Sequence, residues 1–191
     1  MRILVDMDGV LADFEGRFLE LWRAQYPDKE FIQKEQRTTP YLIDQYPAEY
    51  RDLILQIYLS AGFFRSLPPI PGGREALNEI QKTGIEVFIC TTPFVQYRHA
   101  VVEKYEWVEE HLGLEWIERI ILTFDKTLVL GDYLIDDMPS VTGAEKPAWE
   151  HIIYDYPQNA SAKSEKRLTW DNWKEVLLSD EKFRRAYGKD V

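Results

Sequence analysis

The sequence predicts an α/β fold in which an open parallel sheet is flanked by helices and a small helical cap follows the first strand. Three observations support this prediction. Short apolar runs that end abruptly in polar residues are typical of parallel strands buried on both faces. From about residue 70 these runs alternate with helical stretches, as right-handed crossovers require. Residues 14–66, in contrast, contain no convincing strand.

Five apolar runs are the predicted strands: residues 3–5, 87–90, 120–122, 128–130 and 151–154. Helical patterns cover residues 73–83, 95–112 and 171–179. Residues 182–191 carry mixed charge, and we expect this end of the chain to be frayed.

Large apolar side chains recur at helical spacing within residues 14–66. One pattern contains Phe14, Phe18, Leu21 and Trp22, and a second contains Tyr50, Leu53, Ile54, Ile57 and Tyr58. The prolines and glycines of residues 68–73 then offer a hinge where the chain re-enters the core. We expect a core of residues 1–13 and 67–191 and a cap of residues 14–66 that carries a substrate pocket.

Composition restricts the partners and the location of the chain. Its 191 residues suit one domain with an insertion, and the net charge of −10 disfavours nucleic-acid polymers and anionic membranes. The single cysteine, Cys90, lies in an apolar run, so we expect a buried, inert thiol and a reducing compartment. No signal-peptide core or membrane span of roughly 20 apolar residues is recognisable, and we expect a soluble, cytoplasmic protein.

Acidic and hydroxyl residues follow the predicted strands. They are Asp6 and Asp8 after the first strand, Thr91 and Thr92 after residues 87–90, and Asp132, Asp136 and Asp137 after residues 128–130. Ligands of open parallel sheets bind beyond the carboxyl ends of the strands, so we expect these side chains to converge at one edge.

Several carboxylates at one edge would repel each other unless a cation lay between them. With oxygen ligands alone and no cysteine or histidine cluster, Mg²⁺ is the expected metal. Asp6 and Asp137 are the main predicted side-chain ligands, with Asp136 beside them. Asp8 is expected to contribute its backbone carbonyl.

The spacing of Asp6 and Asp8 suits two roles in phosphoryl transfer. Asp6 can attack phosphorus and form an acyl phosphate, while Asp8 protonates the leaving group and then activates water. Gly9 lets the chain turn without crowding the phosphoryl group. Thr91 and Lys126 are the predicted donors to its oxygens.

Each motif alone has an ordinary explanation. Asp6 to Gly9 could be a solvated turn or a calcium loop, but position twelve of such a loop is Arg17 rather than the required glutamate. The threonine pair could cap a helix, and the aspartate pair could lie in a solvated loop. Their joint order after separate strands favours a phosphatase.

At this point the chain resembles the haloacid dehalogenase superfamily, in its phosphatase branch with a Rossmann-type core and a helical cap. Asp6 with Asp8, then Thr91, then Lys126, and finally residues 131–137 look like its four motifs. Longer stretches resemble the 5'(3')-deoxyribonucleotidases: residues 87–91, 103–109, 119–123 and 131–137. The likeness extends from the first strand to residue 173.

This resemblance implies hydrolysis of deoxyribonucleoside monophosphates and is compatible with a homodimer. It further implies that Phe14 and Phe64 stack on the base and that Tyr41 and Tyr58 shape the cap side of the pocket. Aromatic faces stack on bases at roughly 1–3 kcal/mol each. By the same resemblance, a pair of residues helps to hold the phosphate: Thr92 and Lys104.

Two residues depart from the family pattern, and three other functions compete. Thr92 stands where serine is frequent, and this change keeps a hydroxyl. Phe124 stands where a basic residue is frequent, and this change removes a charge near the pocket mouth and leaves base and sugar preference open. The competing functions are a phosphatase for sugar phosphates or other small phosphomonoesters, a phospho-accepting receiver module and an inactive binding protein. The cap and the aspartate two residues after Asp6 argue against a receiver, and the filled catalytic positions argue against an inactive protein.

Overall fold

The computed structural model describes residues 1–95, 97–163 and 166–188. Its strands are β1 (Arg2–Val5), β2 (Glu86–Thr91), β3 (Ile120–Leu122), β4 (Tyr133–Asp136), β5 (Glu150–Tyr154) and β6 (Arg167–Leu168). Its α-helices are α1 (Phe14–Gln25), α2 (Arg51–Tyr58), α3 (Gly73–Lys82), α4 (Tyr97–His111), α5 (Trp173–Ser179) and α6 (Glu181–Tyr187). Short 3-10 helices cover Lys34–Gln36, Leu42–Gln45, Ala48–Tyr50, Leu114–Arg119, Lys126–Leu128 and Pro157–Asn159.

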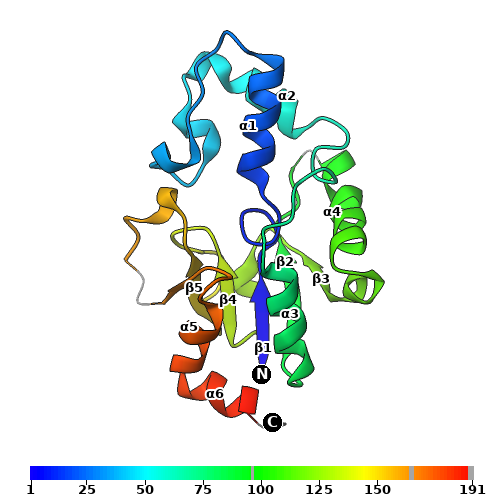
Figure 1. Ribbon diagram of the computed structural model, residues 1–191, viewed down its shortest axis with the longest axis vertical. Coiled ribbons are helices and arrows are strands. Elements are labelled where there is room, and N and C mark those ends of the chain that lie inside the picture. Colours follow the sequence, from blue (N-terminus) through cyan, green and yellow to red (C-terminus); the bar gives the residue numbers. More distant parts are fainter. Residues whose placement is uncertain (96, 164–165, 189–191) are drawn as a thin grey trace.

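The six strands form one parallel sheet in the order β3-β2-β1-β4-β5-β6. β1 is central and pairs with β2 through Val5 and Ile89 and with β4 through Val5 and Ile135. Helices flank this sheet, and the carboxyl end of β1 points toward α1 and α2 (Figure 1). The predicted open parallel α/β sheet is confirmed.

The predicted strand at residues 128–130 is wrong. Leu128 and Leu130 are 61% and 70% exposed, and the chain there leaves a 3-10 helix and runs over the surface. The strand is instead β4, all four of whose residues are buried. Asp136 at the end of β4 interrupts the apolar pattern of that strand. Leu128 and Leu130, in contrast, are exposed, although in the sequence they look like part of a buried apolar run.

The carboxyl-terminal part of the chain is more ordered than expected. β6 was not predicted, and residues 182–187, expected to be frayed, belong to α6. Asp180 caps this helix by accepting hydrogen bonds from the amides of Lys182 and Phe183, and the Phe183 side chain is fully buried. Residues 189–191 lie outside the described part of the chain.

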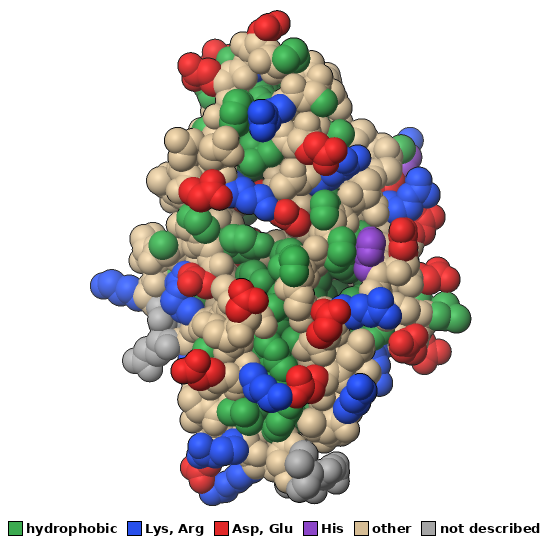
Figure 2. All heavy atoms as spheres, viewed as in Figure 1, with side chains coloured by type: hydrophobic (Ala, Val, Ile, Leu, Met, Phe, Trp, Pro, Cys, Tyr) green, Lys and Arg blue, Asp and Glu red, His purple; other side chains and the backbone are tan. Residues whose placement is uncertain are grey.

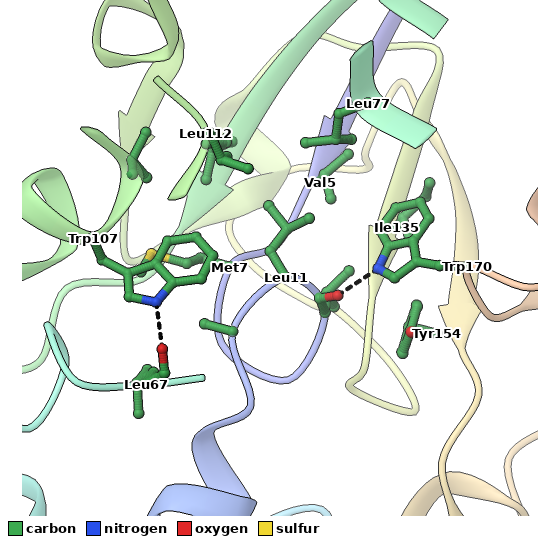
Figure 3. Close-up of a cluster of buried hydrophobic side chains, with 14 of the residues drawn as sticks. Val5, Met7, Leu11, Leu67, Leu77, Trp107, Leu112, Ile135, Tyr154 and Trp170 are labelled. Carbon is green, nitrogen blue, oxygen red and sulfur yellow. Dashed lines mark hydrogen bonds between the residues drawn. The ribbon is translucent and has the colours of Figure 1, made fainter. Parts of the chain in front are cut away.

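The main core packs the helices against the sheet. Figure 3 shows Val5, Leu11, Leu77 and Ile135 in this core, and each is at most 2% exposed. The indole of Trp170 donates a 2.7 Å hydrogen bond to the carbonyl of Val10. This bond ties the loop that follows β1, and so holds the residues after the first strand in place.

A helical insertion follows β1 and forms the upper lobe of the molecule, with α1 and α2 above the ends of the strands (Figure 1). Phe18 and Trp22 of α1 are fully buried and stack with ring centroids 5.7 Å apart. The two connections to the core run side by side, because the amide of Ile70 donates to the carbonyl of Leu11 at 2.7 Å. The amide of Asp13 donates to Pro68 at the same distance.

Hydrophobic side chains gather across the middle of the face that Figure 2 shows. Among the described residues, no helix has the length and apolar character needed to cross a membrane.

Candidate active site

Asp6 lies immediately beyond the carboxyl end of β1, at the centre of the sheet edge. Its amide donates to the carbonyl of Ile135 at 2.9 Å, so the backbone continues the parallel pairing with β4 for one more residue. Its Oδ1 accepts a 2.8 Å hydrogen bond from the amide of Met7. The carboxylate is 8% exposed and therefore has a fixed orientation in a mostly buried place.

Lys126 bridges two carboxylates at this edge. Its Nζ lies 2.9 Å from Asp6 Oδ1 and 2.6 Å from Asp136 Oδ2, and all three side chains are buried. Burial raises the pKa of Asp6 to about 6, against the lowering effect of Lys126. Burial opposes the charge of Lys126, but both carboxylates raise its pKa above the ordinary value. The lysine therefore stays cationic and screens part of the local negative charge.

Asp137 follows β4 directly and faces the loop after β1. A Cβ atom placed on Gly9 would lie 2.5 Å from Asp137 Oδ2, and Gly9 also has a φ of +78°. Only glycine combines this backbone conformation with this close approach. Burial raises the pKa of Asp137 well above its usual range, and Asp136 and Asp6 raise it further.

Three carboxylates offer a set of metal ligands. One oxygen each from Asp6, Asp136 and Asp137 lies within 4.8 Å of the others. Carboxylates at this separation repel each other, and this repulsion adds to the effect of burial in raising the pKa values of Asp6 and Asp137. A divalent cation bound by oxygen ligands would relieve it. The donor set therefore fits a hard metal ion.

Two other acidic residues of the prediction are not part of this three-carboxylate group. Asp132 precedes β4 instead of following a strand, so it lies at the opposite edge of the sheet, where Oδ2 accepts a 2.6 Å bond from the amide of Arg2. The side chain of Asp8 is outside the three-carboxylate group. It turns instead toward Lys104.

Lys104 joins Asp8 to the end of β2. Its Nζ lies 2.6 Å from Asp8 Oδ2 and 2.8 Å from Thr91 Oγ1, and the lysine is fully buried. Asp8 Oδ1 is buried and has no hydrogen-bond partner among the described residues. One oxygen of Asp8 is thus held by a cation, and the other has no donor among the described residues.

A cavity of about 640 Å³ opens above this edge of the sheet. Its floor contains Asp6, Asp8, Lys126, Asp136 and Asp137, and Thr92 also lines it. Its upper wall belongs to the helical insertion and includes Phe14, Tyr41 and Tyr58. The cavity therefore joins a charged floor to a wall that carries aromatic and aliphatic side chains.

The remaining predicted residues occupy different positions. Phe124 lines the cavity and is 65% exposed. Thr91 and Phe64 are each 1% exposed and are not part of the cavity wall. Phe64 packs behind it, with its ring centroid 6.1 Å from that of Phe14 and 5.2 Å from that of Phe94. Both of those aromatics line the cavity.

Sequence reasoning missed two buried polar residues beside the site. Asn159 Nδ2 donates to the carbonyls of Asp137 at 2.7 Å and Tyr154 at 2.8 Å, so it fixes the backbone of a predicted metal ligand. Arg37 is 2% exposed and pairs with Glu15, which lines the cavity. The contacts of Asn159 with Asp137 and of Arg37 with Glu15 each join residues 22 positions apart in the chain, and no local sequence pattern marks such contacts.

The chain was compared with known proteins. The family described as 5' nucleotidase, deoxy (Pyrimidine), cytosolic type C matches residues 1–182. The human cytosolic 5'(3')-deoxyribonucleotidase is 46% identical over 94% of both chains. The human mitochondrial enzyme is 43% identical over 94% of this chain and 83% of its own. A Bordetella pertussis protein, provisionally named 5'(3')-deoxyribonucleotidase, is 49% identical over 94% of this chain and 97% of its own.

Solved structures show a shared fold at low identity. A haloacid dehalogenase family hydrolase from Deinococcus radiodurans, with bound phosphate and sodium, has a TM-score of 0.59 and 16% identity, covering 93% of this chain and 95% of its own. A structure from Thermotoga maritima named as a β-phosphoglucomutase has a TM-score of 0.55 and 19% identity, covering 93% of this chain and 98% of its own.

Proposed function

Since this chain belongs to the 5'(3')-deoxyribonucleotidase family of phosphomonoesterases, we propose that it uses Asp6, Asp8 and Mg²⁺ to hydrolyse pyrimidine deoxyribonucleoside monophosphates. One observation carries the proposal: several carboxylates and the buried Lys126 lie at the floor of a cavity whose opposite wall presents aromatic side chains. The pyrimidine preference rests on the family description.

Asp6 is the proposed nucleophile. Met7 and Lys126 hold its Oδ1, so the carboxylate keeps one orientation and needs little reorganisation before it attacks phosphorus. Attack forms the Asp6 O–P bond as the bond from phosphorus to the nucleoside oxygen breaks. Water then cleaves the aspartyl phosphate, which releases phosphate and restores the carboxylate.

Asp8 is the proposed general acid and base. Lys104 fixes its Oδ2, and Oδ1 can bring a proton to the leaving nucleoside oxygen. The same carboxylate can then accept a proton from the water that attacks the aspartyl phosphate. Lys104 also donates a hydrogen bond to Thr91 Oγ1 at the end of β2. Its positive charge would therefore lie close to the phosphoryl oxygens of the substrate.

Asp6, Asp136 and Asp137 would hold Mg²⁺, which neutralises charge on the phosphoryl oxygens when it is bound. Oxygen donors alone favour a hard cation over zinc. Gly9 leaves room for Asp137, and Asn159 fixes the backbone that carries it.

The nucleoside end of the substrate would meet the cap, which we assign to residues 14–66 with the core at residues 1–13 and 67–191. Phe14, Tyr41 and Tyr58 line the cavity, and aromatic faces there can stack on a base. The exposed ring of Phe124 adds an apolar surface on the core side. Phe64, which lies behind the wall, would support this stacking indirectly.

A phosphate-release assay with Asp6→Asn tests the proposal. The wild-type protein should release phosphate from dUMP and dTMP faster than from UMP, dAMP or glucose 6-phosphate, and chelation of Mg²⁺ should stop the reaction. Asp6→Asn should lose turnover while its circular dichroism and melting stay close to wild type. Faster release from the sugar phosphate would favour the competing phosphatase function, and substantial activity of Asp6→Asn would refute the nucleophile.

We also propose a cytoplasmic location, since a cytosolic-type enzyme is among the relatives, although a mitochondrial one is too. A homodimer is expected from the resemblance to the family. Light scattering on the purified protein measures its mass directly.

A further inference from the structure

Glu103 is a buried carboxylate of α4 that binds backbone amides of another segment. It is 7% exposed, and its Oε1 accepts a 2.6 Å hydrogen bond from the amide of Gly62. Its Oε2 accepts from the amides of Phe64 at 3.0 Å and Arg65 at 3.4 Å. The side chain of Arg65 turns away and pairs with Glu106 at 3.6 Å. The carboxylate of Glu103 therefore binds the backbone of this segment, and these hydrogen bonds do not depend on which side chains the segment carries.

Residues 62–67 are the segment by which the chain returns from α2 to the core, and we call them the return segment. α4 holds it at a second point one turn further along, where the indole of Trp107 donates a 2.7 Å hydrogen bond to the carbonyl of Leu67 (Figure 3). One core helix thus binds the beginning of the return segment through a carboxylate and its end through an indole N–H. Ionised acceptors make stronger hydrogen bonds than neutral ones.

Between these two contacts on α4 lies Lys104, which enters the active site. Its Nζ binds Asp8 and Thr91 and also lies 5.3 Å from the centroid of the Phe64 ring. Phe64 is therefore held twice by adjacent residues of α4, at its amide by Glu103 and at its ring face by Lys104. The same ring packs against Phe14 and Phe94 in the cavity wall.

We propose that Glu103 is a positioning residue that sets the place of the aromatic cavity wall relative to the catalytic edge of the sheet. It acts through the return segment and Phe64 and has no direct role in the chemistry. The inference rests on the proposed hydrolysis of nucleotides, because only a substrate that spans from the phosphate site to the aromatic wall would sense the distance between them. A small phosphate ester that stays at the floor would not.

Glu103→Gln keeps the size of the side chain but turns one of its two acceptor oxygens into an N–H donor that faces an amide. We expect the KM for dUMP to rise on the order of tenfold with little change in kcat, the signature of lost binding that is uniform between ground and transition states. Turnover of acetyl phosphate, which has no ring to reach the wall, should be unchanged. Glu106→Gln is the matched control, because Glu106 lies on the same helix and, among the described residues, pairs with the side chain of Arg65 and not with the backbone of the return segment. The KM of this variant should match wild type.

Hydrogen exchange provides a readout independent of activity. The amides of Gly62, Phe64 and Arg65 should exchange faster in Glu103→Gln, and those within α4 should not. Equal losses for dUMP and acetyl phosphate, or unchanged exchange at these three amides, would overturn the proposal. If Glu103→Gln does not fold, Trp107→Phe removes the other contact of α4 and should raise the KM for dUMP selectively; no selective change would again overturn it. A wild-type protein inactive on nucleotides would refute the proposed function instead, and the exchange result would still stand.

Discussion

Replacement of Asp137 by Asn should stabilise the metal-free protein and abolish its response to Mg²⁺. The carboxylate oxygens of Asp6, Asp136 and Asp137 lie within 4.8 Å of one another. At an effective dielectric constant of about 20, each pair of full charges at that distance repels by about 3.5 kcal/mol. Lys126 offsets part of this repulsion, and the raised pKa of Asp137 relieves more by protonation. Removing the charge of Asp137 should therefore raise the free energy of unfolding of the metal-free protein by about 1–3 kcal/mol.

Thermal melting with EDTA and with Mg²⁺ measures both effects. For a chain of this size each kcal/mol shifts the melting temperature by about 2–4 °C, so Asp137→Asn should melt several degrees above wild type in EDTA. Wild type should gain about 2.7 kcal/mol at a Mg²⁺ concentration 100 times the dissociation constant, and the variant should gain almost nothing.

The pH dependence in EDTA has a defined sign. The folded-state pKa of Asp6 is about 6 and that of Asp137 is raised, so these two groups bind more protons in the folded protein than in the unfolded chain. Their contribution to stability is therefore greatest below the ordinary aspartate pKa and is lost as pH rises through the folded-state values. This loss should be smaller in Asp137→Asn. A variant that melts below wild type in EDTA, or that keeps the full Mg²⁺ shift, would refute the proposed ligand set.

Four further predictions concern the same edge of the sheet. Asp8→Asn should slow dUMP hydrolysis by about 10²–10⁴-fold and affect an activated ester such as p-nitrophenyl phosphate less, because a good leaving group needs no proton; equal losses would contradict the acid role. Lys126→Met should cost about 3–5 kcal/mol in the denaturant-unfolding free energy, because two buried carboxylates lose their cation. Gly9→Ala should lower stability by at least about 1–2 kcal/mol because of its positive φ and should weaken Mg²⁺ binding in calorimetry because its Cβ meets Asp137. Cys90 should react with a thiol reagent only on unfolding, since burial raises its pKa to about 12 and it is fully buried.

The parallel sheet was predictable because most of its strands can be recognised individually in the sequence as short apolar runs. Four of the five predicted runs coincide with β1, β2, β3 and β5, each a short apolar segment followed by polar residues. The exception, residues 128–130, shows the limit of that signal. Exposed leucines and buried leucines look the same in a sequence, and only the partner strands β1 and β5 distinguish β4 as the buried segment.

The site was predictable where function depends on strand ends, and unpredictable where it depends on distant contacts. Asp6 and Asp137 lie beyond β1 and β4, as their order after the strands implied, and their carboxylates converge at one edge of the sheet. The pairing of Lys126 with Asp6 and Asp136 was not part of the prediction, which gave Lys126 the role of a donor to the phosphoryl oxygens. Asn159 and Glu103, by contrast, act through backbone groups of residues 22 and 39–41 positions away, and those groups exist at every residue of the chain.

The misplaced strand also had a chemical consequence. With a strand at residues 128–130, Asp132 would lie at its carboxyl end, inside the site, and Asp136 in a loop. The actual strand reverses both assignments: Asp132 binds the amide of Arg2 at the far edge, and Asp136 ends the strand, fully buried against Lys126. A loop aspartate would be free to turn toward solvent, whereas one fixed in the sheet keeps Lys126 charged and close to Asp6. The nucleophile therefore depends on β4 for the cation that orients it.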